Sequence, residues 1–122
     1  MTFRLSNRSI ERLEGVNPVL VDIVNLAITK TKIDFGVSCG VRTLDTQKKL
    51  VDTGKSQTMN SYHLLQDDMT SWAVDLVAYI DGNVCWEVNV YDDVADAMKA
   101  ACQEIDTKGF RLRWGGAWSV PD

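Results

Sequence analysis

The segment "SYHLLQDDMTSWAVDL", residues 61–76, holds the residue types in this chain that are best suited to bind a metal ion. It contains His63, the only histidine of the sequence, and Asp75, which lies within an apolar run. A neutral imidazole and a carboxylate both suit zinc, and a strand would hold Asp75 rigidly while a loop brings His63 to it. The pattern indicates a metal site formed by His63 and Asp75. A lone histidine beside an aspartate in a loop is also commonly structural, so that interpretation stays open.

Two further carboxylates, Asp67 and Asp68, lie between these residues and could reach a metal ion as a third ligand. Charged residues at a loop tip strongly prefer water, however. We therefore expect the "QDD" stretch to be a solvated loop tip.

The three cysteines, Cys39, Cys85 and Cys102, are an odd number and include no closely spaced pair. This usage is typical of reduced thiols that pack as small apolar side chains. A zinc centre that combines cysteines with His63 remains an alternative, although no CxxC pair supports it. We expect Cys39 to be a buried small residue rather than a nucleophile, because no second histidine is available to activate it.

Cap and stop residues predict the elements of the first half of the chain. Ser6 would cap a short helix that stops at Gly15, and Asn17-Pro18 would begin a second helix. The second helix would bury one apolar face, made of Val16, Leu20, Ile23, Val24 and Ala27. Residues 33–40 are typical of a strand that ends at glycine, and Thr43 would cap a helix over 44–53 that ends at Gly54.

The second half predicts a hairpin, a long helix and a last strand. Residues 72–80 form a β-prone run, and Asp81-Gly82 is a hairpin turn signal before a returning strand over 83–88. Asn89 would cap a helix that closes at Gly109, and "FRLRWGG" would form the last strand. The apolar stripe of that helix would be Val90, Val94, Ala97, Met98, Ala101 and Ile105. These elements predict an α+β fold in which a small, mainly antiparallel sheet packs against helices.

Composition limits the class of protein. The 122 residues, 45% hydrophobic and 25% charged, fit one soluble domain over 1–122, which we expect to be a monomer. A net charge of −4 provides no broad basic field, so we expect no nucleic-acid partner. We also expect no membrane span, because no apolar run approaches roughly 20 residues. The start of the sequence, "MTFRLSNRSIERLEG", is polar, so we expect no signal peptide and a cytoplasmic location at synthesis.

Several segments, in order, carry a resemblance to one family. They are "GVRTLDTQKKLVDTGKSQTMNSYHL", "AVDLVAYIDG", "YDDVADAMKAA" and "RWGGAW". The sequence resembles the phage-type L-alanyl-D-glutamate peptidases, relatives of the VanY-like D-Ala-D-Ala carboxypeptidases and dipeptidases. These are zinc endolysins that cut the peptide stems of bacterial peptidoglycan after holin-type release. The resemblance implies a fold of the Hedgehog/DD-peptidase type.

The resemblance also implies a role for five residues. His63 and Asp75 match zinc ligands, and Ser61 and Arg42 match groups that contact the substrate or support the site. Asp122 falls near the place of the family's catalytic acid/base. The implied mechanism is zinc-assisted hydrolysis, in which the metal polarises the scissile carbonyl and lowers the pKa of its water.

The chain departs from the family's pattern at two points. The motif SxHxxGxAxD separates histidine and aspartate by seven positions, whereas His63 and Asp75 are twelve apart (75 − 63), and Ser71 replaces the motif glycine. The family takes its third ligand from a histidine beyond "WGGAW", and this chain has no second histidine. Two hypotheses follow: an active zinc L-alanyl-D-glutamate endopeptidase, or an inactive relative that keeps the fold and binds cell-wall peptide or regulates a partner.

Overall fold

The computed structural model describes residues 3–56, 59, 61–105, 107, 112–114 and 118–119. Two helices begin the chain, α1 (Asn7–Arg12) and α2 (Pro18–Lys30). The Ser6 hydroxyl accepts a hydrogen bond from the backbone N–H of Ser9, and Asn17 caps α2 in the same way, as predicted. The α2 face predicted to be buried is buried, with Leu20, Ile23, Val24 and Ala27 all at 0% exposure.

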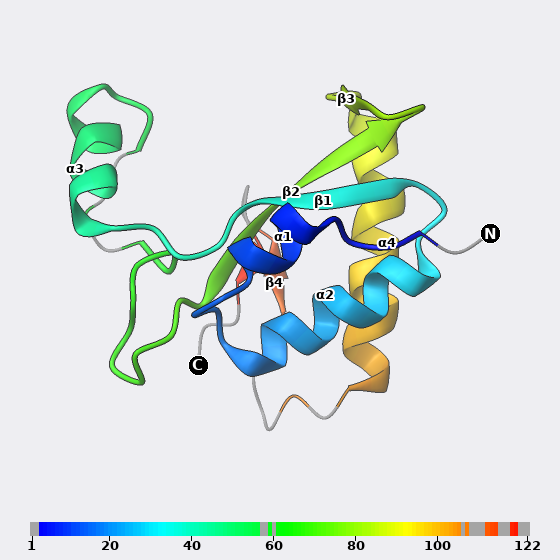
Figure 1. Cartoon of the computed structure of the whole chain (residues 1–122), viewed down its shortest axis with the longest axis horizontal. Coiled ribbons are helices and arrows are strands. Elements are labelled where there is room, and N and C mark those ends of the chain that lie inside the picture. The colour runs from blue at the N-terminus through cyan, green and yellow to red at the C-terminus, as the bar shows by residue number, and fades with distance from the viewer. Residues whose placement is uncertain are drawn as a thin grey trace.

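The next elements are β1 (Asp34–Cys39) and α3 (Leu44–Asp52). Thr43 accepts from the backbone N–H of Thr46 and caps α3, and Gly54 follows the helix with a φ of +77°. Both residues act as predicted, because a hydroxyl satisfies a free N–H at the helix start and glycine tolerates the left-handed conformation at its end. In Figure 1, α3 lies at one end of the molecule, away from α2 and α4.

The hairpin consists of β2 (Ala73–Ile80) and β3 (Asn83–Cys85). Asp81 and Gly82 have φ angles of +51° and +81°, so both central turn residues are left-handed. This is the conformation that an Asp-Gly turn favours between antiparallel strands, and it confirms the predicted hairpin. The returning strand is shorter than the predicted 83–88, because β3 ends at Cys85 and Val88 belongs to the next helix.

The longest helix is α4 (Val88–Glu104). The prediction that Asn89 caps it is wrong, because Glu87 occupies the cap position and makes no side-chain hydrogen bond there. The backbone N–H of Val90 bonds to the Glu87 carbonyl instead, so the helix begins two residues earlier than predicted. The predicted stripe is buried at Val90, Val94, Ala97, Met98 and Ala101. Gly109, the predicted end of the helix, lies outside the described residues.

One sheet joins the five described strands, and every pairing between these strands is antiparallel. The long strand β2 pairs with β1 on one side. It also pairs with β3 near its C-terminal end and with β5 (Trp118–Ser119) near its start, and β5 in turn pairs with β4 (Arg113–Trp114). The predicted α+β class with a small antiparallel sheet is therefore correct. The start of β2, which carries Asp75, lies at the centre of this sheet.

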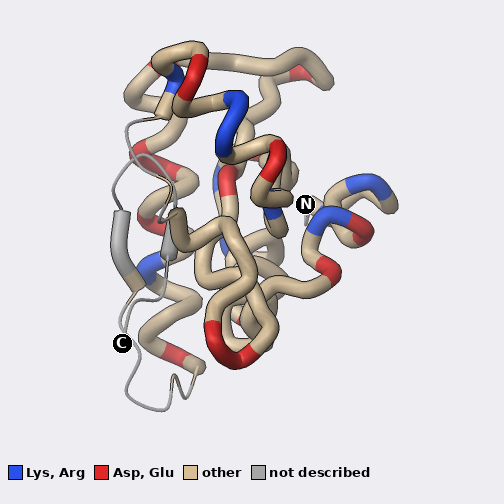
Figure 2. The backbone as a smooth tube through the Cα atoms, turned by 90° about the vertical axis from the view of Figure 1, so that its left-hand side faces the viewer, with Lys and Arg blue, Asp and Glu red and all other residues tan. Residues whose placement is uncertain are grey.

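The core lies between the sheet and the crossing helices α2 and α4 (Figure 1). Phe35 and Val37 of β1 and Val74 and Ala78 of β2 join the buried residues of both helices. Helix α1 packs on β1. Figure 2 shows acidic and basic positions scattered over the backbone, and every charged position from Asp67 to Asp96 is acidic. No helix among the described residues is long and apolar enough to cross a membrane.

Candidate metal centre

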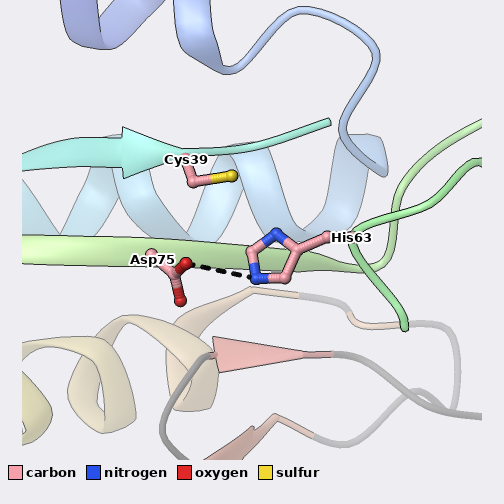
Figure 3. Close-up of side chains that lie close together, drawn as sticks. All are labelled: Cys39, His63 and Asp75. Atoms are coloured by element: carbon pink, nitrogen blue, oxygen red, sulfur yellow. Dashed lines mark ion pairs between the residues drawn. The ribbon is translucent and has the colours of Figure 1, made fainter. Parts of the chain in front are cut away.

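Three potential metal ligands meet where β1 ends and β2 begins. Cys39 and Asp75 are paired across the two strands, and His63 reaches them from the loop before β2 (Figure 3). One ligand atom from each of Cys39, His63 and Asp75 lies within 4.8 Å of the other two. Nε2 of His63 lies 3.4 Å from Oδ2 of Asp75. The structure therefore brings together the two predicted ligands, His63 and Asp75.

Helix α1 fixes the end of β1 that carries Cys39. The β1–β2 register shifts between Val37 and Cys39, which is an irregularity of the ladder. Two α1 side chains bond to the backbone of Val37: Ser9 Oγ accepts from its N–H at 3.0 Å, and Arg12 Nη1 donates to its carbonyl at 2.9 Å. These bonds hold the bulged strand, so the position of Cys39 is set by an element far from it in the sequence.

Backbone contacts set the orientation of His63. Its Nδ1 lies 2.8 Å from the carbonyl oxygen of Gly40. A carbonyl oxygen only accepts hydrogen bonds, so Nδ1 carries the proton of this bond and Nε2 is left facing Asp75. Ser61 Oγ accepts from the backbone N–H of His63 at 3.1 Å, and the Arg42 N–H donates to the His63 carbonyl at 2.8 Å. Ser61 thus contacts the turn that presents His63.

The lack of a side chain at Gly40 allows its backbone to pack closely against Arg12 and Val16. A Cβ at this position would lie 2.0 Å from the Arg12 carbonyl oxygen and 2.9 Å from a methyl group of Val16. No side chain fits there without moving the end of α1 or of β1. The glycine thus allows the α1 turn to approach the carbonyl that holds the imidazole.

The five extra residues between His63 and Asp75 fold into a closed turn. Leu65 and Ser71 form an antiparallel bridge, and the Gln66 N–H bonds to the Thr70 carbonyl at 2.8 Å. The chain therefore leaves and returns at neighbouring points, so the longer spacing does not separate His63 from Asp75. Such a loop costs little entropy for each added residue.

The turn also keeps its carboxylates away from the centre. Asp68 accepts hydrogen bonds from the N–H and hydroxyl of Thr70 and from Trp72 Nε1, and both Asp67 and Asp68 are exposed. The bond from the Thr70 hydroxyl lowers the pKa of Asp68. The expectation of a solvated loop tip is confirmed. Trp72 stacks on Tyr62 with ring centroids 6.4 Å apart.

Arg42 lies beside the three ligands. Its Nη1 donates to Oε1 of Gln47 at 2.8 Å, and its Nη2 lies 3.5 Å from Oδ2 of Asp75 and 3.9 Å from Sγ of Cys39. Gln47 is fully buried, and its Nε2 donates to Ser56. Sequence reasoning did not identify Gln47. In the sequence, Gln47 is one of several polar residues of α3, and its burial becomes clear only from the structure.

The charges of the centre are coupled. Burial opposes protonation of His63, but its contacts with Asp75, Cys39 and the Gly40 carbonyl outweigh burial and raise its pKa to about 9. The contact with His63, helped by Arg42, lowers the pKa of the Cys39 thiol against the effect of burial. Without a metal ion, the centre thus favours the imidazolium form of His63.

One buried atom points to a ligand that the chain itself does not supply. The His63 side chain is 6% exposed, and its Nε2 has no hydrogen-bond partner among the described residues. An unsatisfied buried nitrogen is costly unless something coordinates it. Imidazole, carboxylate and thiolate are the donor types that zinc accepts, so the residues present fit a zinc ion.

The predicted site residues have different outcomes. His63, Asp75 and Arg42 lie together and Ser61 supports them, whereas Asp122 lies outside the described residues. Cys39 was expected to be a buried small side chain, with a zinc centre of cysteines and His63 as the alternative. It is half-buried and contacts the centre, because the pairing of β1 with β2 places it opposite Asp75.

Comparisons with known proteins match nearly the whole chain. The L-alanyl-D-glutamate peptidase of Escherichia phage T5 is 27% identical over 124 aligned positions, which cover 98% of this chain and 85% of that protein. The crystal structure of the Serratia marcescens L-Ala D-Glu endopeptidase ChiX matches with a TM-score of 0.83 and 34% identity, covering 97% of this chain and 90% of that one. The profile of the family described as phage L-alanyl-D-glutamate peptidase matches residues 1–121. A chain that carries this profile over nearly its whole length, with His63 and Asp75 facing each other across the loop, belongs to the phage L-alanyl-D-glutamate peptidase family.

Proposed function

We propose that this chain is a metal-dependent peptidoglycan hydrolase of the phage endolysin type, which cuts the L-Ala–D-Glu bond of stem peptides. The observation that carries the proposal is that His63 and Asp75, the motif residues of the family, face each other. Nε2 of His63 is buried and has no hydrogen-bond partner among the described residues. The match to the family over residues 1–121 supports the L-Ala–D-Glu bond as the one that is cut.

His63 and Asp75 would hold the metal ion, and zinc is the ion that the family resemblance implies. A bound zinc ion supplies Lewis acidity, which polarises a carbonyl and acidifies water. His63 offers its Nε2 because Gly40 occupies Nδ1, and Asp75 offers a carboxylate held on the central strand. Their positions are fixed before the substrate arrives, which lowers the reorganisation that the reaction requires.

Arg42 would act on the substrate side of the same centre. Its guanidinium is 15% exposed and carries a positive charge beside Asp75. A stem peptide contains carboxylates, and a guanidinium binds a carboxylate through two parallel hydrogen bonds. Gln47 fixes one terminal nitrogen of this group, so Arg42 would present a defined orientation to the peptide. We place this action at the cell wall, reached by release during lysis.

The test is cleavage of a synthetic stem peptide beginning L-Ala–D-Glu, with products identified by mass spectrometry. The zinc-loaded chain should release L-Ala, and His63→Ala and Asp75→Asn should lose more than about 99% of the rate, since a catalytic metal needs its ligands. Asp67→Asn is the matched control, because Asp67 is an exposed aspartate of the same segment, and it should keep full activity.

Two results would contradict the proposal. Cleavage at another bond, or equal cleavage by His63→Ala, would refute the assigned chemistry. Binding of the peptide without cleavage by the zinc-loaded chain would instead support the second hypothesis, an inactive relative that keeps the fold.

A further inference from the structure

We propose that Cys39 is a ligand of the metal beside His63 and Asp75, so that these three residues form a Cys-His-Asp centre. Among the described residues, His63 is the only one with an imidazole. A catalytic zinc usually has three protein ligands and one open position. Among the described residues, the only group of three potential ligands that lie close enough together is Cys39, His63 and Asp75.

The strand pairing presents the thiol to the site. Cys39 and Asp75 are register partners across β1 and β2, so their side chains project from the same face of the sheet. Figure 3 shows the sulfur and the carboxylate approaching the imidazole from the two neighbouring strands. Small side-chain rotations suffice to bring three donors within 4.8 Å of one another to bonds of about 2.0–2.3 Å with one ion.

The buried nitrogen of His63 indicates that a metal ion fits this space, next to a positive group that is already present. Nη2 of Arg42 lies 3.9 Å from Sγ of Cys39 and 3.5 Å from Oδ2 of Asp75, so a bound ion would share both proposed ligands with this guanidinium. The Nε2 atom of His63, on a side chain that is only 6% exposed, has no hydrogen-bond partner in the part of the chain that the structure describes. A metal ion would supply the missing partner and a second positive charge for the same two atoms.

The other role open to a thiol beside an imidazole is that of a nucleophile. In that role an imidazole nitrogen must accept the proton of the thiol while the carboxylate orients the ring from its other nitrogen. Nδ1 of His63 instead donates its proton to the Gly40 carbonyl at 2.8 Å. In the neutral ring, which is the form that binds a metal, Nε2 is then the only nitrogen with a free lone pair, and it faces the carboxylate. This arrangement suits coordination better than proton transfer from the thiol.

The inference rests on the proposed function for the identity of the metal, and its test does not depend on activity. Cobalt(II) is added to the metal-free chain and the absorption spectrum is recorded. A thiolate ligand gives an intense sulfur-to-cobalt charge-transfer band in the near ultraviolet. We expect this band in the wild type and its loss in Cys39→Ser. We also expect Cys39→Ser to lower zinc affinity more than about 100-fold, above the 10- to 100-fold that loss of an outer partner costs.

Matched controls separate ligation from a general effect of losing a thiol. Cys85→Ser and Cys102→Ser remove thiols that are also half-buried but lie outside the group, and both should keep the band and the affinity. X-ray absorption of the zinc-loaded wild type needs no variant and should show one sulfur at about 2.3 Å. Circular dichroism checks that Cys39→Ser is folded.

The outcomes distinguish this inference from the proposed function. Cobalt binding without the band, no sulfur at the zinc, or unchanged affinity in Cys39→Ser would overturn the inference, and stem-peptide cleavage could still stand. A chain that binds no metal would overturn both. The band together with a complete lack of cleavage would leave the Cys-His-Asp centre established and refute the peptidase function.

Discussion

At the scale of single residues, the centre is defined by what holds His63. A backbone carbonyl fixes Nδ1, a serine hydroxyl fixes the turn, and Asp75 lies opposite Nε2. The metal-free imidazole is therefore charged at neutral pH, and a metal ion must displace its proton. Metal binding to such a site is coupled to pH because the ligand has to be deprotonated.

The raised pKa of His63 predicts how the stability of the metal-free chain depends on pH. The folded chain holds the proton up to a pKa of about 9, whereas the ordinary pKa of histidine, which applies to the unfolded chain, is 6.5. The stabilisation is thus complete below pH 6.5, declines as the pH rises and is lost above about 9. It amounts to the order of 2 kcal/mol in the free energy of unfolding.

Urea unfolding with a chelator present measures this effect. Because the lowered pKa of Cys39 contributes with the opposite sign, both chains in the comparison carry Cys39→Ser. The single variant should lose stability as the pH rises above 6.5, over a narrower range than the wild type because the contact of His63 with Cys39 is gone, and the double variant with His63→Gln should lose markedly less. Equal losses in the two chains would show that His63 is not the group responsible.

Arg42→Lys should impair hydrolysis without removing the metal. The guanidinium of Arg42 contacts Gln47 through Nη1 and Asp75 through Nη2. Lysine keeps the charge, but its single ammonium group cannot make both contacts in this geometry. Loss of a charged hydrogen bond of about 1.5–3 kcal/mol predicts a fall in kcat/KM of roughly 10- to 100-fold, mainly through KM. Arg8→Lys, at an exposed position of α1, is the control. A KM unchanged by Arg42→Lys would argue against contact with the peptide.

At the scale of elements, the centre depends on how α1, β1 and the 61–72 loop meet. Gly40 lies at that junction, and its carbonyl holds the imidazole. Gly40→Ala should therefore destabilise the chain by about 1–3 kcal/mol, because the new methyl group would overlap the Arg12 carbonyl. It should also weaken zinc binding, since the carbonyl that orients His63 must shift.

Gly54→Ala is the comparison that isolates packing from backbone conformation. Gly54 has a φ of +77°, and a Cβ added there would meet no atom within 4 Å, so only the left-handed backbone opposes the substitution. It should cost about 1 kcal/mol and leave zinc affinity unchanged. Thermal unfolding and zinc titration of both variants provide the measurement. If both variants bind zinc equally well, the role assigned to the Gly40 carbonyl is wrong.

The sequence predicted those elements whose signals are local. The caps Ser6, Asn17 and Thr43 and the Asp81-Gly82 turn act as expected, since each forms its bonds within a few residues. Asn89 failed as a cap because a backbone bond from Val90 to Glu87 closed the first turn without it.

The composition of the centre could be predicted only in part. The motif pointed to His63 and Asp75, but the place of Cys39 depends on the bulged register of β1 on β2, which no local signal reveals. In the same way, the closed turn between Leu65 and Ser71 explains why the longer spacing is harmless. Gln47 was missed because its burial results from tertiary packing rather than from the helical pattern.

At the scale of the whole molecule, the centre joins elements from distant parts of the chain. Strand β1, the loop before β2 and β2 itself each contribute one ligand atom. A metal ion that binds all three favours the folded state, because the unfolded chain does not hold them together.

Zinc should therefore raise the melting temperature. At a free zinc concentration about 100 times Kd, linkage predicts about 2.7 kcal/mol of stabilisation, or roughly 10 °C in Tm for a chain of this size. His63→Ala should abolish most of the shift, and Asp68→Ala should retain it because Asp68 bonds within its own turn. A shift of the same size in His63→Ala would place the zinc elsewhere.

The central claim is that one metal ion at this centre carries out the cleavage of L-Ala–D-Glu. The most direct test adds zinc stepwise to the metal-free chain and records bound zinc and the initial rate of stem-peptide cleavage in the same samples. We predict a rate that rises in proportion to bound zinc and stops rising at one ion per chain. Full activity in the metal-free chain, or one bound zinc per chain without cleavage, would contradict the claim.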